Sequence, residues 1–354
     1  MMMKMDIPDQ VRAARAHYYQ HINQFSMTPL WEVLGRLVPR SPTPLVQPAL
    51  WKYAEVREQV MQAGRLISAE EAERRVLILE NPGLRGNSSV TQSLYAGLQL
   101  IMPGEVAPAH RHTQSALRLV LDGEGAYTAV DGERTTMRRG DFIITPAWTW
   151  HDHGNLGEQP VVWLDGLDIP LVRFFDAGFA EPGHDLSQQV SRPEGDALAR
   201  YGSNMVPVDF SQPANAPTKV FVYPYAHTRA ALARVSQGAI DAHHGYKQRF
   251  VNPATGASPM PTMGAFIQWL PQGFESLPYR CTDATVYVCL EGEGEALVGE
   301  QLLRFQENDV FVVPSWSSLQ LRAQRQSILF SYSDRPAQQA IGLWREERLA
   351  RPAA

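Results

Sequence analysis

His110 and His112 stand two residues apart, and His151 follows them further along the chain. Because side chains two residues apart in a β-strand point to the same face, both imidazoles can face one interior. A third imidazole from a neighbouring strand would complete one triangular face of a metal site and leave the other coordination positions open for chemistry. Imidazole suits iron, zinc, copper and nickel, so the ligand type alone does not name the metal.

The residues around these histidines give them a structural frame. Glycine, proline and asparagine flank both halves of the pattern, at Gly104, Gly140, Pro146 and Asn155. This order is similar to the two signature motifs of the cupin superfamily, whose metal ligands lie inside a β-barrel. The superfamily usually has a glutamate ligand shortly after the second histidine, where this chain has Ala116 and Leu117. We therefore expect three neutral imidazoles and no carboxylate at the metal.

Composition places the chain among ordinary globular proteins. Its 354 residues are 44% hydrophobic and 19% charged, with 32 Lys and Arg against 37 Asp and Glu, a net charge of −5. The absence of long like-charge runs argues against a nucleic-acid partner. No secretory signal and no apolar run of membrane-spanning length occurs in the sequence. With no targeting segment, Cys281 and Cys289 predict core thiols in a reducing cytoplasm.

The pattern along the chain changes from helical to strand-like near residue 74. Apolar residues three and four apart predict helices over 11–25 and 31–37, and Ser68 is typical of a helix N-cap. Short β-branched and apolar runs separated by glycine then predict strands, at 76–79, 96–101, 116–121, 125–130, 141–145 and 161–164.

We predict an all-β-dominated fold, a bicupin of two tandem β-barrels with an N-terminal helical arm. The expected parts are the helical arm (1–73), a metal-binding barrel (74–180), an irregular connector (181–245) and a second barrel (246–354). A helix over 338–349 is expected to close the second barrel.

The two strand regions repeat one unit. The run Leu-Asp-Gly-Glu-Gly at 121–125 recurs as Leu-Glu-Gly-Glu-Gly at 290–294. In this register the three histidine positions fall on Tyr279, Cys281 and Leu319. The second barrel is therefore expected to be structural and to pack on the first barrel and on other subunits. A separate ligand pocket in the second barrel is the alternative.

Longer stretches resemble one enzyme family. The runs at 110–118, 148–155 and 163–170, with others at 29–35, 81–84, 251–256, 331–336 and 343–346, are similar to the gentisate 1,2-dioxygenases and cover nearly the whole chain. The resemblance implies an Fe(II) enzyme that adds both atoms of O2 to gentisate (2,5-dihydroxybenzoate) and opens the ring to maleylpyruvate. It also implies a homotetramer whose partners are a small aromatic acid and O2.

Other functions fit parts of the same pattern. Relatives with the same ligands act on salicylate or 1-hydroxy-2-naphthoate, although the order His-Asp-His-Gly-Asn at 151–155 favours the gentisate branch. A non-catalytic small-molecule-binding cupin is opposed by the intact ligands and nearby arginines. A metal-dependent sugar isomerase is opposed by the degenerate second barrel.

Two further residues follow from strand parity. Arg118 shares the parity of His110 and His112, so an unbroken strand would direct its guanidinium, a natural partner for a carboxylate, into the same interior. His153 shares the parity of His151. We expect His153 to hydrogen-bond the substrate hydroxyl or oxygen and to move a proton.

The resemblance implies the remaining substrate-binding positions. Arg74 matches a second substrate arginine, with the adjacent Arg75 as the alternative register, and the other positions are Tyr95, Gly97, Gln99 and Asp165. Trp148 is predicted to lie in the core. The histidines without ligand spacing are predicted to be structural, namely His17, His21, His184, His227, His243 and His244.

Overall fold

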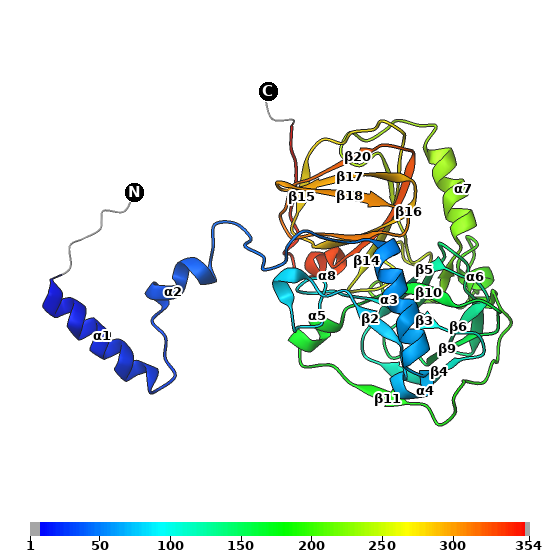
Figure 1. The fold of residues 1–354 in the computed structure, drawn as a ribbon, viewed down its shortest axis with the longest axis horizontal. Helices are drawn as coiled ribbons and strands as arrows, with labels where there is room; N and C mark the ends of the chain where they lie inside the picture. Colours follow the sequence, from blue (N-terminus) through cyan, green and yellow to red (C-terminus); the bar gives the residue numbers. More distant parts are fainter. Residues whose placement is uncertain (1–7, 351–354) are drawn as a thin grey trace. The chain divides into compact units, whose positions relative to one another are not determined.

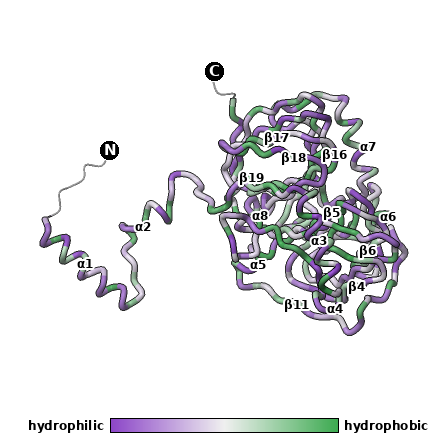
Figure 2. Tube along the Cα trace, in the orientation of Figure 1, coloured by the Kyte–Doolittle hydropathy of each residue, from purple (hydrophilic) through white to green (hydrophobic). Residues whose placement is uncertain are grey.

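The structure is a computed structural model that describes residues 8–350. Its contacts divide the chain after Thr43 into two compact units. In the first unit, α1 (Asp9–Asn23) and α2 (Leu30–Leu37) correspond to the two helices that the apolar spacing predicts. Trp31 Nε1 donates to Tyr19 OH at 2.8 Å, and that hydroxyl donates to Glu32 at 2.7 Å. The trace of α1 is mostly hydrophilic (Figure 2). Residues 1–7 and 351–354 of the predicted parts lie outside the described residues.

Barrel 1 consists of two facing antiparallel sheets. One has the strand order β12-β8-β5-β10-β3-β2, and the other has the order β11-β4-β9-β6-β7. The strands are β2 (Val76–Ile78), β3 (Tyr95–Ile101), β4 (Val106–His112), β5 (Ala116–Asp122), β6 (Ala126–Val130), β7 (Glu133–Thr136), β8 (Phe142–Thr145), β9 (His151–Asn155), β10 (Val161–Leu167), β11 (Ala180–Pro182) and β12 (Val222–Tyr223).

Barrel 2 repeats this arrangement, with sheet orders β1-β19-β16-β21-β14-β13 and β18-β17-β20-β15-β22. The two tandem barrels confirm the predicted bicupin architecture (Figure 1). The strands are β1 (Ala49–Trp51), β13 (Tyr246–Arg249), β14 (Gly264–Leu270), β15 (Tyr279–Cys281), β16 (Thr285–Glu291), β17 (Glu293–Val298), β18 (Gln301–Gln306), β19 (Val310–Val313), β20 (Leu319–Ala323), β21 (Ser327–Ser333) and β22 (Glu346–Arg348).

The barrels pack against each other through the outer faces of their larger sheets. One apolar core joins side chains of both barrels, including Leu98 and Leu117 of barrel 1 and Val286 and Phe330 of barrel 2. Tyr332 OH donates to the Tyr95 carbonyl at 2.9 Å across this contact. A Cβ on Gly166 would come within 2.8 Å of the Tyr332 ring, so this close approach requires glycine. The contact leaves the interior of each barrel free to hold its own side chains.

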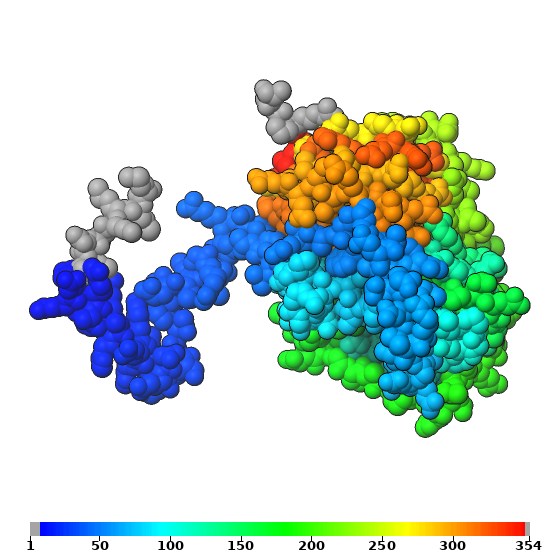
Figure 3. All heavy atoms as spheres, in the orientation of Figure 1, coloured from blue at the N-terminus to red at the C-terminus, as the bar shows by residue number. Residues whose placement is uncertain are grey.

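Helix α3 (Tyr53–Leu66) lies outside the barrels and is bonded to both. Figure 3 shows this light-blue segment extending from orange barrel 2 over barrel 1. The Tyr53 amide donates to Asp309 of barrel 2 at 2.8 Å. Arg57 pairs with Asp122 of barrel 1 at 2.6 Å. Ser68 caps α4 (Ala69–Ala72) by accepting from the Glu71 amide, so the predicted N-cap is confirmed.

Three segments differ from the sequence predictions. Residues Ala49–Trp51 of the predicted helical arm form β1, because they pair with β19 of barrel 2. The connector predicted to be irregular contains α6 (Asp196–Tyr201) and α7 (Tyr225–Val235), and α7 buries Leu232. The predicted closing helix is largely wrong: α8 (Arg335–Ala340) ends near Gly342, whose φ of +75° leaves the helical region, and β22 follows.

The remaining helices are short. A 3-10 turn, η1 (Pro82–Leu84), precedes β3, and α5 (Ile169–Phe174) follows β10. Within residues 8–350 the helices are all too short or too polar to cross a membrane. Cys281 and Cys289 are buried free thiols, as predicted for core side chains.

Candidate metal centre

The histidine cluster is formed by two neighbouring strands of barrel 1. His110 and His112 lie at the end of β4, and His151 begins β9, directly opposite His110 in the strand register. Their ligand atoms lie within 4.8 Å of one another, and this is the group with metal-ligand geometry in the described part of the chain. The period-two spacing of β4 therefore brings both imidazoles to the same side as His151.

Local hydrogen bonds orient each imidazole. The Nδ1 of each ring lies near a backbone carbonyl two residues away: Pro108 for His110 at 3.3 Å, Gln114 for His112 at 2.8 Å and Thr149 for His151 at 2.9 Å. A carbonyl only accepts, so for His112 and His151 these contacts place the proton on Nδ1 and leave the lone pair on Nε2. The Nε2 of His151 is buried without a hydrogen-bond partner among the described residues. An orphaned acceptor facing two other imidazoles fits a metal ion.

The surroundings keep these imidazoles neutral. Burial, followed by the charge of Arg74, lowers the pKa of His110 to about 3. Burial also lowers the pKa of His112 to about 4 and holds the pKa of His151 well below its ordinary value. Neutral imidazole is the form that binds a metal, so the site needs no proton release near neutral pH.

Arg118 reaches the same interior from the opposite sheet. It lies on β5, opposite Asp165 of β10, and its Nε is 3.4 Å from Asp165 Oδ1. Its Nη1 donates to Thr145 Oγ1 at 2.6 Å. The strand does not continue unbroken from His112, because β4 ends there and β5 begins at Ala116. Arg118 faces the interior, as strand parity predicted, but the unbroken strand that this prediction assumed is not present.

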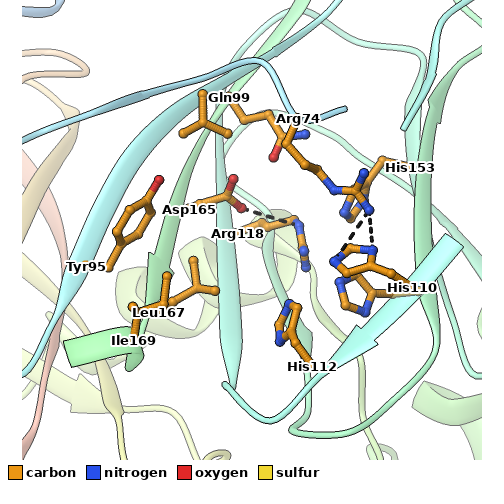
Figure 4. Close-up of a pocket in the computed structure, with 12 residues that line it drawn as sticks. Arg74, Tyr95, Gln99, His110, His112, Arg118, His153, Asp165, Leu167 and Ile169 are labelled. Atoms are coloured by element: carbon orange, nitrogen blue, oxygen red, sulfur yellow. Dashed lines mark hydrogen bonds and ion pairs between the residues drawn. The ribbon is translucent and has the colours of Figure 1, made fainter. Parts of the chain in front are cut away.

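The structure distinguishes between Arg74 and Arg75. Arg74 lines the cavity, contacts the His110 ring and donates to the Pro108 carbonyl at 2.5 Å. Arg75 points away and pairs with Glu105 through both guanidinium ends at 2.7 and 2.9 Å. Figure 4 shows the guanidinium groups of Arg74 and Arg118 both directed toward the histidines.

The cavity between these groups has a volume of about 160 Å³. Most of the sequence-predicted site residues line it: Arg74, Tyr95, Gln99, His110, His112, Arg118, His151, His153 and Asp165. Gly97 supplies room instead of a contact, because a Cβ there would lie 2.7 Å from the Tyr95 hydroxyl and 2.5 Å from Val76.

Some site residues escaped the sequence analysis. Val76, Leu167 and Ile169 supply apolar wall. Thr128 Oγ1 lies 3.0 Å from His153 Nδ1, and it orients that ring. Strand parity could have identified Leu167, which is two residues after Asp165, but the position of Thr128 depends on the pairing of β6 with β9.

Trp148 was predicted to lie in the core, and this prediction is wrong. Its side chain is 37% exposed, and its backbone adopts a φ of +58° that turns the residue outward. The ring packs against Phe179 in a tilted arrangement, with centroids 4.6 Å apart and an angle of 55° between the ring planes. The residue therefore belongs to the outer surface behind the metal ligands.

The corresponding interior of barrel 2 has different chemistry. When the two barrels are aligned, Tyr287 takes the place of Arg118 and Ser331 takes the place of Asp165. Tyr287 and Ser331 also lie opposite each other, on β16 and β21. Lys247 of β13 lies opposite Gln268, as Val76 lies opposite Gln99 in barrel 1. Leu319 at the position of His151 cannot bind a metal, which fits a structural role for this barrel.

Comparison with known proteins agrees with this architecture. The cupin-domain family model matches residues 97–167. The chain is 51% identical over 339 residues to gentisate 1,2-dioxygenase 1 of Aquipseudomonas alcaligenes, covering 96% of this chain and 97% of that relative. It is 37% identical to the gentisate 1,2-dioxygenase of a Streptomyces species, covering 93% and 94%. The salicylate 1,2-dioxygenase of Pseudoaminobacter salicylatoxidans, solved as adducts with gentisate, superposes with a TM-score of 0.89 at 33% identity, covering 98% and 96%.

Two cupin barrels, one with a three-histidine site and one without it, define a metal-binding bicupin protein. The chain belongs to the gentisate 1,2-dioxygenase family of ring-cleaving oxidoreductases, and the predicted family resemblance is confirmed.

Proposed function

We propose that this protein is an Fe(II)-dependent gentisate 1,2-dioxygenase that converts gentisate and O2 to maleylpyruvate. The observation that carries the proposal is a single cavity lined by the histidine cluster and by two guanidinium groups, Arg74 and Arg118. Two relatives named as gentisate 1,2-dioxygenases support the choice of substrate. Bound by the three imidazoles, Fe(II) would supply redox chemistry toward O2 and open coordination positions.

The charges that line the cavity suit an anionic substrate. Arg74 and Arg118 contribute two positive charges and Asp165 one negative charge, so with neutral histidines the sum is 2 − 1 = +1. Burial lowers the pKa of Arg74 only to about 10, so this arginine stays charged at neutral pH. Burying a cation without an adequate partner is costly, and the substrate carboxylate supplies the partner.

Arg118 is the group that binds the carboxylate in this proposal. Its side chain is 4% exposed, and its Nε has no hydrogen-bond partner among the described residues. Thr145 and Asp165 hold the guanidinium plane, which leaves N–H groups for the ligand. An arginine held in this way can bind a carboxylate through two parallel hydrogen bonds.

In this proposal His153 accepts or donates a proton during the reaction. Its Nδ1 is engaged by Thr128, so its Nε2 is the nitrogen available to the cavity. Burial lowers its pKa well below the ordinary value, and the uncharged imidazole can accept a proton from a substrate hydroxyl at Nε2.

The size of the cavity favours a single aromatic ring. An apolar cavity of roughly 150 Å³ holds one benzene ring, and this cavity is about 160 Å³. The bicyclic skeleton of 1-hydroxy-2-naphthoate is larger than one ring, so its turnover tests this preference. Salicylate, which has one ring, stays the second candidate because a salicylate 1,2-dioxygenase shares the fold.

Oxygen uptake tests the proposal. Protein loaded with Fe(II) without air would be given gentisate, salicylate or 1-hydroxy-2-naphthoate in parallel, with metal content measured for each sample. We expect one O2 consumed per gentisate and little uptake with the bicyclic acid. Preference for salicylate would change the substrate and keep the chemistry. A lack of uptake with all three acids in iron-loaded protein would refute the proposal.

The assembly and location are also proposals. We propose a homotetramer in the cytoplasm, supported by the family resemblance and by the two free thiols. Light scattering of the purified protein would measure its mass directly, and a monomer would exclude the tetramer.

A further inference from the structure

Arg111 lies between the two ligand histidines of β4, but its side chain follows the opposite parity and points outside the barrel. The guanidinium carbon lies 4.5 Å from the centre of the Trp148 ring and 4.8 Å from that of Trp150. Both distances are within the range of cation–π attraction. Because Trp150 immediately precedes His151, one guanidinium contacts both ligand-bearing segments.

Glu181 completes this group. Its Oε2 accepts from Arg111 Nε at 2.9 Å and from Nη2 at 2.6 Å. Glu181 belongs to β11, which pairs with β4 so that Ala180 lies opposite His112 and Pro182 lies opposite His110. We call Arg111, Trp148, Trp150 and Glu181 the outer clamp.

The backbone of the outer clamp is bonded to a ligand strand. The Trp148 amide donates to the His112 carbonyl at 2.7 Å. Trp148 has a φ of +58°, in the left-handed region that bulky residues rarely adopt. Such a conformation persists where its surroundings hold it in place, and the stacked Arg111 is one of those surroundings.

Barrel 2 repeats three of the four outer-clamp residues without the ligands, and Ser318 stands at the position of Trp150. Arg280 lies over Trp316 at 4.7 Å and pairs with Glu347 of β22 at 2.6 Å. Trp316 has a φ of +62°, and its amide donates to the Cys281 carbonyl at 2.6 Å. The arginine, the first tryptophan and the glutamate of the outer clamp therefore belong to the repeated unit, and their copy in barrel 2 provides an internal control.

We propose that Arg111 is a positioning residue for the metal centre. Each ligand ring is oriented by a carbonyl two residues away, so the direction of its Nε2 follows the local backbone. Arg111 fixes the spacing between β4 and the turn before His151, and so holds the imidazoles in their converging arrangement. This inference rests on the metal site of the proposed function. It gives a residue on the outer surface of the barrel a role in positioning the metal ligands.

Matched variants in the two barrels test this role. Arg111→Met and Arg280→Met remove the guanidinium, and the milder Glu181→Gln and Glu347→Gln remove only the ion pair. For each full-length protein we would measure the Fe(II) dissociation constant by anaerobic competition with a chelator, the melting temperature without metal, and kcat and KM at saturating iron. His110→Ala would be included as the loss of a ligand.

We expect Arg111→Met to raise the Fe(II) dissociation constant about tenfold, the lower end of the effects seen for groups that orient metal ligands. Glu181→Gln should shift it less and in the same direction. Arg280→Met and Glu347→Gln should lower the melting temperature by a similar amount and leave the dissociation constant unchanged. Saturating iron should restore most of kcat in Arg111→Met.

Unchanged iron affinity in Arg111→Met would overturn the inference, and so would an equal loss in Arg280→Met. These results differ from failure of the metal site itself, which would show as unaltered iron binding in His110→Ala. The measured dissociation constants therefore separate the positioning role from the proposed function.

Discussion

Arg118 on β5 lies directly opposite Asp165 on β10, with Nε 3.4 Å from Oδ1 and with side chains 4% and 7% exposed. Burial raises the pKa of Asp165 to about 6, while Arg118 acts in the opposite direction. The carboxylate and Thr145 hold the guanidinium from behind, so its free N–H groups face the histidines. This pair sets both the charge and the direction of the anion-binding side of the cavity.

Replacing Arg118 should mainly weaken substrate binding. Truncating one partner of a buried charged pair typically costs 2–5 kcal/mol, so Arg118→Met should weaken gentisate affinity by roughly a hundredfold. The matched control is Arg75→Met, because Arg75 is also buried and ion-paired but lies outside the cavity. Binding would be followed by anaerobic titration. An unchanged gentisate affinity in Arg118→Met would show that the carboxylate binds elsewhere.

Each ligand histidine should be essential for metal retention. His110→Ala, His112→Ala and His151→Ala should each lose bound iron and turnover, because two imidazoles cannot form the triangular face. Cys281→Ala, at the position equivalent to His112 in barrel 2, should keep both properties. Metal analysis after gel filtration, with oxygen uptake on the same samples, measures this. Full iron content in any histidine variant would exclude that residue as a ligand.

His153 should affect turnover more than binding. Loss of a positioned general acid or base typically slows a reaction 10²–10⁴-fold, so His153→Gln should reduce kcat by about a hundredfold with a modest change in KM. Thr128→Val, which removes the partner of Nδ1, should give an intermediate loss. Steady-state kinetics at saturating O2 would show this. If KM rises while kcat stays constant, His153 binds substrate without moving a proton.

Lys247 in barrel 2 should make stability depend on pH. Burial lowers its pKa from 10.5 to about 8, and its amine lies 3.4 Å from the Tyr287 hydroxyl. Between these two pH values the unfolded chain binds more protons than the folded chain, so this residue makes the free energy of unfolding rise with pH in that window. Below pH 8 the folded protein bears the full free-energy cost of burying the protonated amine.

The Lys247→Met variant should therefore be more stable than the parent at pH 7, by about 1–3 kcal/mol. The difference should shrink as the pH rises from 8 toward 10.5. Lys219→Met, which removes an exposed lysine, should show no such trend. Urea denaturation at several pH values measures both variants. A Lys247→Met variant that is less stable at pH 7 would indicate that the buried amine has a stabilising partner.

Local periodicity accounts for the features that the sequence predicted. The period of two in β4 places His110 and His112 on one face, and the glycine-separated runs correspond to strands such as β3 and β5. The repeat at 121–125 and 290–294 indicated two barrels, because both copies follow the same strand pattern. These inferences need only the order of residues within one strand or one repeat.

Other features depend on pairing between distant segments. The strands β1 and β22 complete the sheets of barrel 2 from the N-terminal and C-terminal parts of the chain, and their local sequence does not specify those partners. The outward position of Trp148 depends on its left-handed backbone and on contacts with Arg111 and Phe179. A tryptophan within an apolar motif is otherwise expected to be buried.

The sequence by itself determined the barrel repeat, the ligand types and the family, because residue identity and short-range spacing are sufficient for these. Only the tertiary structure decided that Arg74 and not Arg75 faces the cavity, since both residues precede β2 and Glu105 holds the Arg75 guanidinium away from the cavity. It also brought Arg118 to the histidines from the opposite sheet, although the chain turns between β4 and β5. Both outcomes depend on contacts between segments that are distant in the sequence, and these are set by pairing and packing across the whole barrel.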